Sequence, residues 1–263
     1  MSEDIREQLW RFVCKYCKSD AEQGVVLQAP TAALVIRPRE YNVCSFPDES
    51  AYVCYFNECW DARRRCCDNI ALPFEGINLT VHPQVFSPNI LETYATSVLW
   101  DVVRSFGVEG KTVADIGCGC GVLSILAAKQ GAVKVHAFEI DSDAVENASE
   151  NIHSHGVEDI VMIEQVDFAV STSVCTFDVI LISLPLAEDA WKSNASCTLK
   201  VVGSAIDAIQ QSAHRRLNPG GRAFLVRGSF EGTYKPCGEF AVDRSTIAHA
   251  FGHTFWVESL SSS

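Results

Sequence analysis

Three glycines at every second position, Gly117, Gly119 and Gly121, stand where an apolar, strand-like run changes to a helical pattern. Glycine lets the backbone turn tightly and leaves its amide groups uncovered, so that a ligand can lie directly on the main chain. The start of the following helix adds oriented N–H groups. A loop of this kind needs a buried strand before it and a packed helix after it, which restricts the chain to folds that alternate strands and helices.

The sequence from Lys111 onward alternates short apolar runs with stretches of helical periodicity. The apolar runs predict strands at Thr112–Ile116, Lys134–Ile140, Ile160–Val166, Phe177–Ser183, Arg222–Val226 and Thr254–Leu260. The helical stretches are Val122–Lys129, Asp143–His153 and Leu199–Leu217, the last ended by Asn218-Pro219-Gly220-Gly221. Strands separated by helices predict a mostly parallel sheet with helices on both of its faces.

An acidic residue, Glu139, lies at the end of the strand that follows the glycine loop. A carboxylate at this place can accept hydrogen bonds from both hydroxyls of a ribose, which predicts a nucleoside cofactor. The glycine spacing is G-x-G-x-G with Asp115 two residues before it, whereas a dinucleotide site has G-x-G-x-x-G. The register is therefore wrong for cradling a pyrophosphate.

The segment Asp115–Lys129, together with Gly131–Val135 and the Glu139 strand, resembles motif I of the Rossmann-like S-adenosylmethionine-dependent methyltransferases. The resemblance runs from about Val81 to Leu260. It implies S-adenosylmethionine as the cofactor. The fold class that we predict is α/β, with a doubly wound, mostly parallel, seven-stranded sheet and an N-terminal α+β appendage.

The resemblance also implies which residues hold the cofactor. Those in and beside the glycine loop are Asp115, Gly117, Cys118, Gly119, Gly121, Glu139 and Ile140. After the third strand, Asp167 would bond the adenine amino group and Phe168 would pack on the adenine ring. A position in the apolar core is the alternative for Phe168.

The loop after the fourth strand, Ser183-Leu184-Pro185-Leu186, corresponds to motif IV of the same family. In members that methylate amide, amine and base nitrogens this loop resembles Asn-Pro-Pro-aromatic, and here Ser183 replaces the Asn and Leu186 the aromatic. Ser183 and Pro185 are the candidate catalytic residues, and Ser183 is also a candidate cofactor contact. The departure argues against a planar amide or exocyclic base amine as acceptor, although a hydroxyl could still orient a nitrogen.

Upstream, the run Pro83-Gln84-Val85-Phe86-Ser87-Pro88 resembles the P-x-V-F-x-P segment of the small-domain methyltransferases. In that group the segment closes over the cofactor, which makes Phe86, Pro88 and Thr93 candidate contacts. A proline-rich linker between two parts of the chain is the alternative.

The chain carries a net charge of −12, from 21 Lys and Arg residues against 33 Asp and Glu residues. Phosphate binding draws on clustered basic side chains, so this charge disfavours nucleic acid as a partner. Residues 1–80 carry −3 of the charge and residues 81–263 carry −9. We predict that the first range is an accessory region that shapes the substrate pocket and that the second is the methyltransferase domain.

Seven of the twelve cysteines precede residue 68. Cys14 and Cys17 have the spacing of a zinc knuckle, but no second pair follows at a matching distance. The helical pattern of residues 3–18 favours burial of Cys17, so we predict no metal site. The chain has neither an apolar signal region nor a run of about 18 apolar residues, which predicts a cytoplasmic protein without a membrane partner.

These features predict an enzyme that transfers a methyl group from S-adenosylmethionine by in-line displacement. The acceptor would be a nitrogen or oxygen of a small molecule or of a protein side chain. An RNA base methyltransferase and a non-catalytic, cofactor-binding scaffold subunit are the alternatives.

Overall fold

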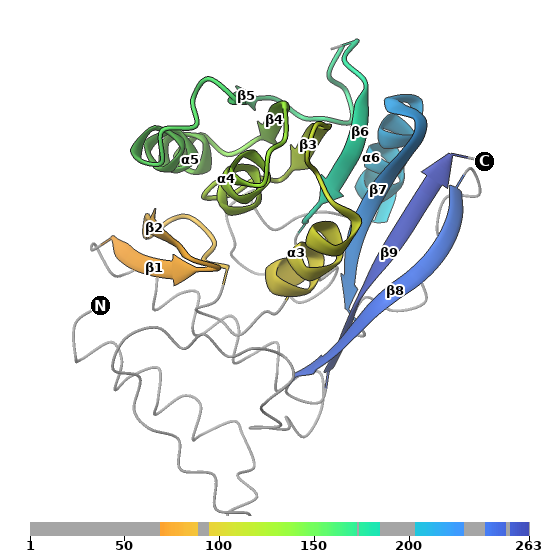
Figure 1. The fold of residues 1–263 in the computed structure, drawn as a ribbon, viewed down its shortest axis with the longest axis horizontal. Coiled ribbons are helices and arrows are strands. Elements are labelled where there is room, and N and C mark those ends of the chain that lie inside the picture. The colour runs from red at the N-terminus through yellow and green to blue at the C-terminus, as the bar shows by residue number, and fades with distance from the viewer. Residues whose placement is uncertain are drawn as a thin grey trace, which may run out of the picture.

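The computed structural model describes residues 69–88, 95–172, 174–184, 203–228, 240–250 and 253–262 (Figure 1). The strands are β1 (Ile70–Phe74), β2 (Ile77–Val81), β3 (Thr112–Ile116), β4 (Lys134–Glu139), β5 (Val161–Gln165), β6 (Phe177–Ile182), β7 (Leu217–Gly228), β8 (Phe240–Ala250) and β9 (His253–Ser262). The helices are α3 (Ala95–Phe106), α4 (Val122–Lys129), α5 (Ser142–Ser154) and α6 (Gly203–Arg215).

Seven strands form one sheet in the order β5-β4-β3-β6-β7-β9-β8. The five strands from β5 to β7 run parallel, while β9 is antiparallel to both β7 and β8. The predicted α/β class with a mostly parallel, seven-stranded sheet is therefore confirmed.

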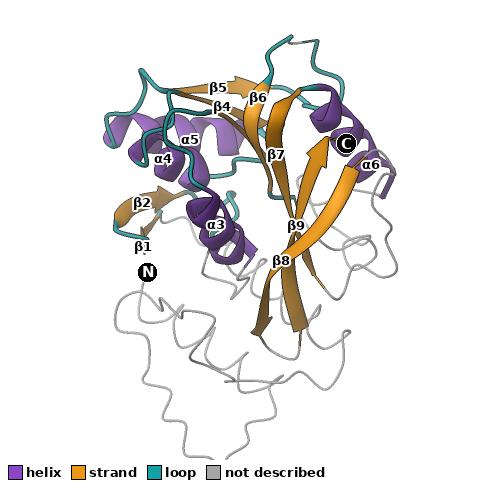
Figure 2. Ribbon diagram, turned by 45° about the vertical axis from the view of Figure 1, so that its right-hand side comes forward, coloured by secondary structure: helices purple, strands orange, loops and turns teal. Residues whose placement is uncertain are grey.

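Helices cover both faces of this sheet, as Figure 2 shows. Successive side chains of a strand point to opposite faces, and in β3 Val113 belongs to one apolar core while Ala114 belongs to another. The first core also takes in side chains of α3, α4 and α5, and the second takes in Ile206 and Ile209 of α6. The sheet is thus doubly wound, with α6 on the face opposite the other described helices.

The strand order reverses beside β3. The chain passes from β3 through α4 to β4 on one side, and β6 later pairs with the other side of β3. In open α/β sheets, ligands bind at such a switch point, outside the carboxyl ends of the strands. The glycine loop follows β3 at this place, and Ser183 follows β6.

The predicted elements around the site agree closely with the structure, and those toward the C-terminus agree less well. Strand β3 and helix α4 have the predicted bounds. Strand β7 begins at Leu217 and not at Arg222, because Leu217 and Arg222 both pair with β6 and the four residues between them form an irregularity in the register. Two further elements, α3 and β8, lie outside the predicted ones, as does the hairpin of β1 and β2.

The hairpin shares its core with the rest of the fold. A two-residue turn joins its strands, in which Glu75 and Gly76 have positive φ angles of 45° and 85°. Its inward side chains belong to the core beneath α3, α4 and α5, namely Leu72, Phe74, Ile77, Leu79 and Val81. The domain boundary after residue 80 stays a prediction, and Cys14 and Cys17 lie outside the described residues. Among the described helices, none is long and apolar enough to cross a membrane.

Candidate cofactor site

Backbone hydrogen bonds, two of them to β4, hold the glycine loop at the carboxyl end of β3. The amides of Gly117 and Cys118 both donate to the Phe138 carbonyl, at 2.9 and 3.2 Å, and the Gly121 amide donates to the Cys118 carbonyl at 2.9 Å. Gly117 has a φ of 73°, and a Cβ atom there would lie 2.8 Å from the Ser183 carbonyl oxygen. Only glycine fits this position, because a side chain would be both strained and in collision with backbone.

Glu139 ties the end of β4 to this loop. Its Oε2 accepts a hydrogen bond from the Gly119 amide at 3.0 Å, and its Oε1 accepts from the amides of Ile140 and Asp141 at 2.8 and 3.2 Å. The side chain is buried. Burial raises the pKa of Glu139 above its ordinary value, and the three amides oppose that rise. The carboxylate therefore lies against the glycine loop, where the sequence predicts a partner for ribose hydroxyls.

Asp115 is a second buried carboxylate, two residues before the loop. The Ser124 hydroxyl donates to its Oδ2 at 2.6 Å, while its Oδ1 has no hydrogen-bond partner within the described part of the chain. Burial raises the pKa of Asp115 to about 6, and the hydrogen bonds from Ser124 oppose the rise. Buried polar atoms without a partner are rare, so Oδ1 is a candidate for contact with a ligand.

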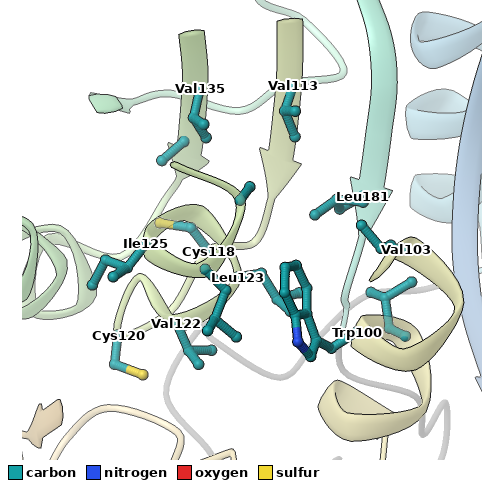
Figure 3. Close-up of a cluster of buried hydrophobic side chains, with 14 of the residues drawn as sticks. Trp100, Val103, Val113, Cys118, Cys120, Val122, Leu123, Ile125, Val135 and Leu181 are labelled. Atoms are coloured by element: carbon teal, nitrogen blue, oxygen red, sulfur yellow. The ribbon is translucent and has the colours of Figure 1, made fainter. Parts of the chain in front are cut away.

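The two cysteines of the loop are part of the apolar core. Cys118 and Cys120 are buried among Val122, Leu123 and Ile125 of α4 (Figure 3). Burial raises the pKa of Cys120 to about 12 and that of Cys118 well above its ordinary value. Both thiols stay protonated at neutral pH and act as small spacers.

Ile140 and Asp167 follow the carboxyl ends of β4 and β5, and both side chains are exposed. Ile140 is 53% exposed. The Val166 amide donates to the Glu139 carbonyl at 2.8 Å, which keeps the two strand ends together. Asp167 accepts a hydrogen bond from the Ala169 amide through Oδ1 at 2.9 Å. The adenine contacts predicted for these residues stay predictions.

Phe168 lies in the second apolar core and is only 2% exposed. Its ring packs edge-on against Phe138, with 5.0 Å between the centroids, and the Arg216 guanidinium lies 4.5 Å from its centroid. These surroundings match the core alternative, and the predicted stacking on adenine stays untested.

The backbone of the loop after β6 closes against the glycine loop. The Ser183 amide donates to the Ile116 carbonyl at 3.2 Å, and the Ser183 carbonyl faces Gly117 as described above. Ser183 therefore lies beside the cofactor loop, at the switch point. Pro185 and Thr93 lie outside the described residues.

The upstream candidates pack near the first core. Phe86 is partly buried against it and Pro88 is buried. Their predicted contact with the cofactor stays a prediction. Among the described residues, no three His, Cys, Asp or Glu side chains form a group that could hold a metal ion.

Comparison with known proteins shows the family to which the chain belongs. Residues 76–253 match a family described as the methyltransferase small domain. The chain belongs to that family. The predicted resemblance to the Rossmann-like S-adenosylmethionine-dependent methyltransferases is thereby confirmed at the level of family and fold.

Two relatives of this chain are both described as ribosomal protein L11 methyltransferases. The ribosomal protein L11 methyltransferase of Thermotoga maritima is 29% identical over 160 residues, which cover 58% of this chain and 59% of the relative. That of Exiguobacterium sp. is 42% identical over 76 residues, which cover 28% of this chain and 24% of the relative. The match thus spans less than two thirds of the length of either relative.

Two solved structures show the same fold. The ribosomal protein L11 methylase of Lactobacillus delbrueckii subsp. bulgaricus gives a TM-score of 0.50 at 19% identity, covering 67% of this chain and 81% of that one. Trm5b of Pyrococcus abyssi gives 0.52 at 22% identity, covering 74% of this chain and 56% of that one.

Two polar residues at the site are absent from the predicted site residues, although Ser124 lies within the segment Asp115–Lys129 that resembles motif I. Ser124 bonds Asp115, and its one available signal is that it is a polar residue in the otherwise apolar stretch of α4. Asn151 donates to the Cys120 carbonyl from α5, at 2.9 Å. Its partners lie 31 and 71 residues away in the sequence, so the sequence alone does not predict these contacts.

Proposed function

We propose that this chain binds S-adenosylmethionine at the carboxyl ends of β3 and β4 and catalyses methyl transfer. The observation that carries the proposal is the buried Glu139 carboxylate, which bonds the Gly119 amide at 3.0 Å at the point where the strand order reverses. A glycine loop and an acidic strand end in this relation form a site for a nucleoside. Membership of the methyltransferase small domain family supports the choice of cofactor.

The residues present fit this cofactor. Glu139 would accept the ribose hydroxyls, and the exposed side chain of Ile140 offers an apolar surface to the adenine, with Asp167 near its amino group. Asp115 Oδ1 needs a partner, and the methionine part of the cofactor carries cationic groups that favour nearby carboxylates. When bound, the cofactor supplies a methyl group already activated on a sulfonium. The protein then has to align the acceptor and exclude water.

For the acceptor, we propose a nitrogen or oxygen of a protein side chain or small molecule, with a basic protein favoured. The chain carries a net charge of −12, which attracts cationic partners and repels nucleic acid. The relatives described as ribosomal protein L11 methyltransferases support a protein acceptor. The same relatives support our proposal that the reaction takes place in the cytoplasm. Ser183 lies beside the cofactor loop and is the candidate for orienting the acceptor atom.

The ribose assignment is tested by titrating S-adenosylhomocysteine and its 2′-deoxy analogue into wild type and Glu139→Gln. A hydrogen bond to a charged group contributes about 1.5–3 kcal/mol, so removal of the hydroxyl should weaken binding to wild type about ten-fold or more. The loss should be much smaller in Glu139→Gln. Equal losses in the two proteins would show that Glu139 does not bind the ribose. Thermal unfolding of both proteins controls for damage to the loop.

The acceptor is tested by methyl transfer from labelled cofactor into separate protein, RNA and small-molecule fractions. Label in protein or small molecules is the expected result. Label in RNA alone would replace the proposed acceptor with a nucleic acid. Cofactor binding without transfer into any fraction would favour the scaffold alternative.

A further inference from the structure

Two asparagines one turn apart, Asn147 and Asn151, are buried on the same face of α5. Their exposed fractions are 0% and 1%. Asparagine is a poor helix former, and a buried amide is stable only when its donors and acceptor are bonded. The burial of both side chains is therefore explained by their hydrogen-bond partners.

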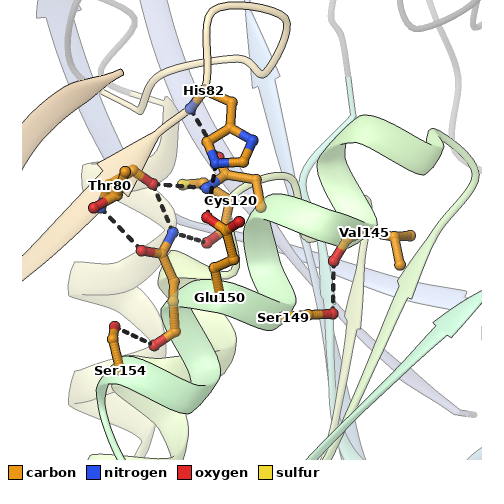
Figure 4. A network of polar contacts seen from close by, with 9 residues as sticks. Thr80, His82, Cys120, Val145, Ser149, Glu150 and Ser154 are labelled. Atoms are coloured by element: carbon orange, nitrogen blue, oxygen red, sulfur yellow. Dashed lines mark hydrogen bonds and ion pairs between the residues drawn. The ribbon is translucent and has the colours of Figure 1, made fainter. Parts of the chain in front are cut away.

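Both asparagines bond the edge of β2, in a network that joins Thr80 and His82 to α5 (Figure 4). Asn147 accepts from the His82 amide at 3.1 Å and donates to the Thr80 carbonyl at 2.8 Å. Asn151 accepts from the Thr80 amide at 2.9 Å and donates to the Thr80 carbonyl at 2.8 Å. The two amides thus dock the hairpin on α5.

Only Asn151 also reaches the glycine loop. Its Nδ2 donates to the Cys120 carbonyl at 2.9 Å, while the amide of Asn147 bonds the hairpin alone within the described residues. Cys120 lies between Gly119 and Gly121, and a Cβ atom at Gly121 would lie 3.3 Å from the Cβ of Ala148. Helix α5 therefore touches the loop at two points, by close packing at Ala148 and by a hydrogen bond from Asn151.

We propose that Asn151 is a positioning residue for the cofactor loop, and that through it the conformation of the loop depends on the docked hairpin. The inference rests on the proposed function, because it takes the loop to be the cofactor site. A single amide satisfies the Thr80 amide, the Thr80 carbonyl and the Cys120 carbonyl at once. If the hairpin moves away, the side chain of Asn151 loses two of its three partners and is no longer held in the geometry that fixes Cys120.

The contact has a second consequence for the site. Strand β2 runs directly into residues 82–88, which include the candidate cofactor contacts Phe86 and Pro88. The bonds from Asn147 and Asn151 fix where that segment leaves the hairpin. The same helix therefore places the glycine loop and the start of the segment that is predicted to cover it.

The two asparagines supply a matched pair of variants. Asn151→Ala removes the bonds to the hairpin and the loop, whereas Asn147→Ala removes bonds to the hairpin alone. Both variants should lower the thermal midpoint by several degrees, since both lose buried hydrogen bonds. Asn151→Ala should weaken S-adenosylhomocysteine binding about five-fold, and Asn147→Ala less than about two-fold, because one net hydrogen bond contributes about 1 kcal/mol. Equal losses of affinity, or none in either variant, would overturn the proposal.

Hydrogen exchange keeps the proposal testable if a variant fails to fold or if wild type binds no cofactor. In wild type, S-adenosylhomocysteine should slow exchange of the Thr80 amide as well as of residues 117–121. Protection confined to the loop would overturn the coupling. If wild type binds no ligand, the proposed function fails by itself, and ligand-free exchange still decides the inference. Asn151→Ala should then speed exchange in residues 117–121 and Asn147→Ala should not, and equal exchange in both variants would overturn it.

Discussion

The parallel strands of the seven-stranded sheet begin at one edge, the amino edge, and end at the other, the carboxyl edge. The pKa values of buried or partly buried carboxylates are shifted in opposite directions at these two edges. At the carboxyl edge, burial raises the pKa of both Asp115 and Glu139. At the amino edge, Asp178 accepts hydrogen bonds from the amide and hydroxyl of Thr112 and from the Asn218 side chain, each at 2.8 Å. Burial alone would raise the pKa of Asp178, but these bonds outweigh it and lower the pKa.

The difference separates a structural edge from the edge where we propose that the ligand binds. Asp178 joins the beginnings of β3, β6 and β7, and the fold itself stabilises its charge. Asp115 keeps one oxygen unbonded within the described residues, and the fold leaves its charge unfavourable. Proteins retain such unfavourable groups mainly where function needs them. The contrast supports the proposal that a cationic ligand binds at the carboxyl edge.

The largest effect should come from a matched pair of glycines, one at each edge. A Cβ atom at Gly117 would lie 2.8 Å from the Ser183 carbonyl oxygen, and one at Gly221 would lie 2.9 Å from the Asp178 carbonyl oxygen. Both Gly117→Ala and Gly221→Ala should lower the free energy of unfolding by about 2–3 kcal/mol, measured by urea denaturation.

Cofactor affinity should separate these two variants. Gly117→Ala should weaken S-adenosylhomocysteine binding by about a hundred-fold, because the loop has to shift by several tenths of an ångström. Gly221→Ala should leave the dissociation constant of the folded protein unchanged. A similar loss of affinity in both variants would remove the distinction between the edges.

The pH dependence of stability should differ in sign between the edges. The pKa of Asp115 is about 6 in the folded chain, against an ordinary value of 3.8. As the pH rises, the unfolded chain loses this proton first, so the stability from the neutral carboxyl is present below the ordinary pKa and is lost as the pH rises to about 6. Asp178, whose pKa is lowered, contributes stability above its ordinary pKa and loses it as the pH falls.

Urea denaturation of wild type and Asp115→Asn across this pH range checks the sign. The difference in free energy of unfolding should shift in favour of Asp115→Asn by up to about 3 kcal/mol between pH 4 and pH 7. Asp178→Asn should show the opposite trend, with its deficit growing as the pH rises. Parallel curves for wild type and Asp115→Asn would mean that Asp115 titrates at its ordinary pKa.

The two edges also differ in how far the sequence predicts them. The carboxyl edge depends on a local pattern, in which three glycines, the preceding strand and Glu139 lie within the 28 residues from Thr112 to Glu139, and those elements agree with the structure. Asp178, Thr112 and Asn218 carry no such pattern, since they meet only when three strands begin side by side. Asn151 and its hairpin partner Thr80 lie 71 residues apart in the sequence, so no helical or strand periodicity predicts their contact. The role of Phe168 could not be predicted from the sequence either. An aromatic residue after a strand gives the same sequence pattern in an apolar core as in a ligand pocket.

A smaller effect is expected at the amino edge itself. Asp178→Ala removes the carboxylate that accepts three hydrogen bonds, and it leaves the Thr112 amide, the Thr112 hydroxyl and the Asn218 side chain without this acceptor. The free energy of unfolding should fall by about 1–2 kcal/mol at pH 7. Binding of S-adenosylhomocysteine should stay within two-fold of wild type, measured calorimetrically well below the new thermal midpoint. Asn218→Ala, which removes one of the three bonds, should have a smaller effect on stability. A marked loss of affinity in either variant would show that the amino edge also shapes the ligand site.

The smallest effect is expected where a carboxylate is exposed. Glu150 lies on α5 beside the buried asparagines, and its Oε2 lies 2.8 Å from His82 Nε2, with side-chain exposures of 53% for Glu150 and 18% for His82. Solvent screens such a pair, so Glu150→Gln should change the free energy of unfolding by at most about 0.5 kcal/mol. Urea denaturation at pH 6 and pH 8 would measure it, with Glu158→Gln on the exposed His153 pair as the control. Because His82 N is also held by Asn147, the hairpin should stay docked and cofactor affinity should not change. A loss of affinity in Glu150→Gln would show that the exposed ion pair, and not the buried amides, holds the hairpin on α5.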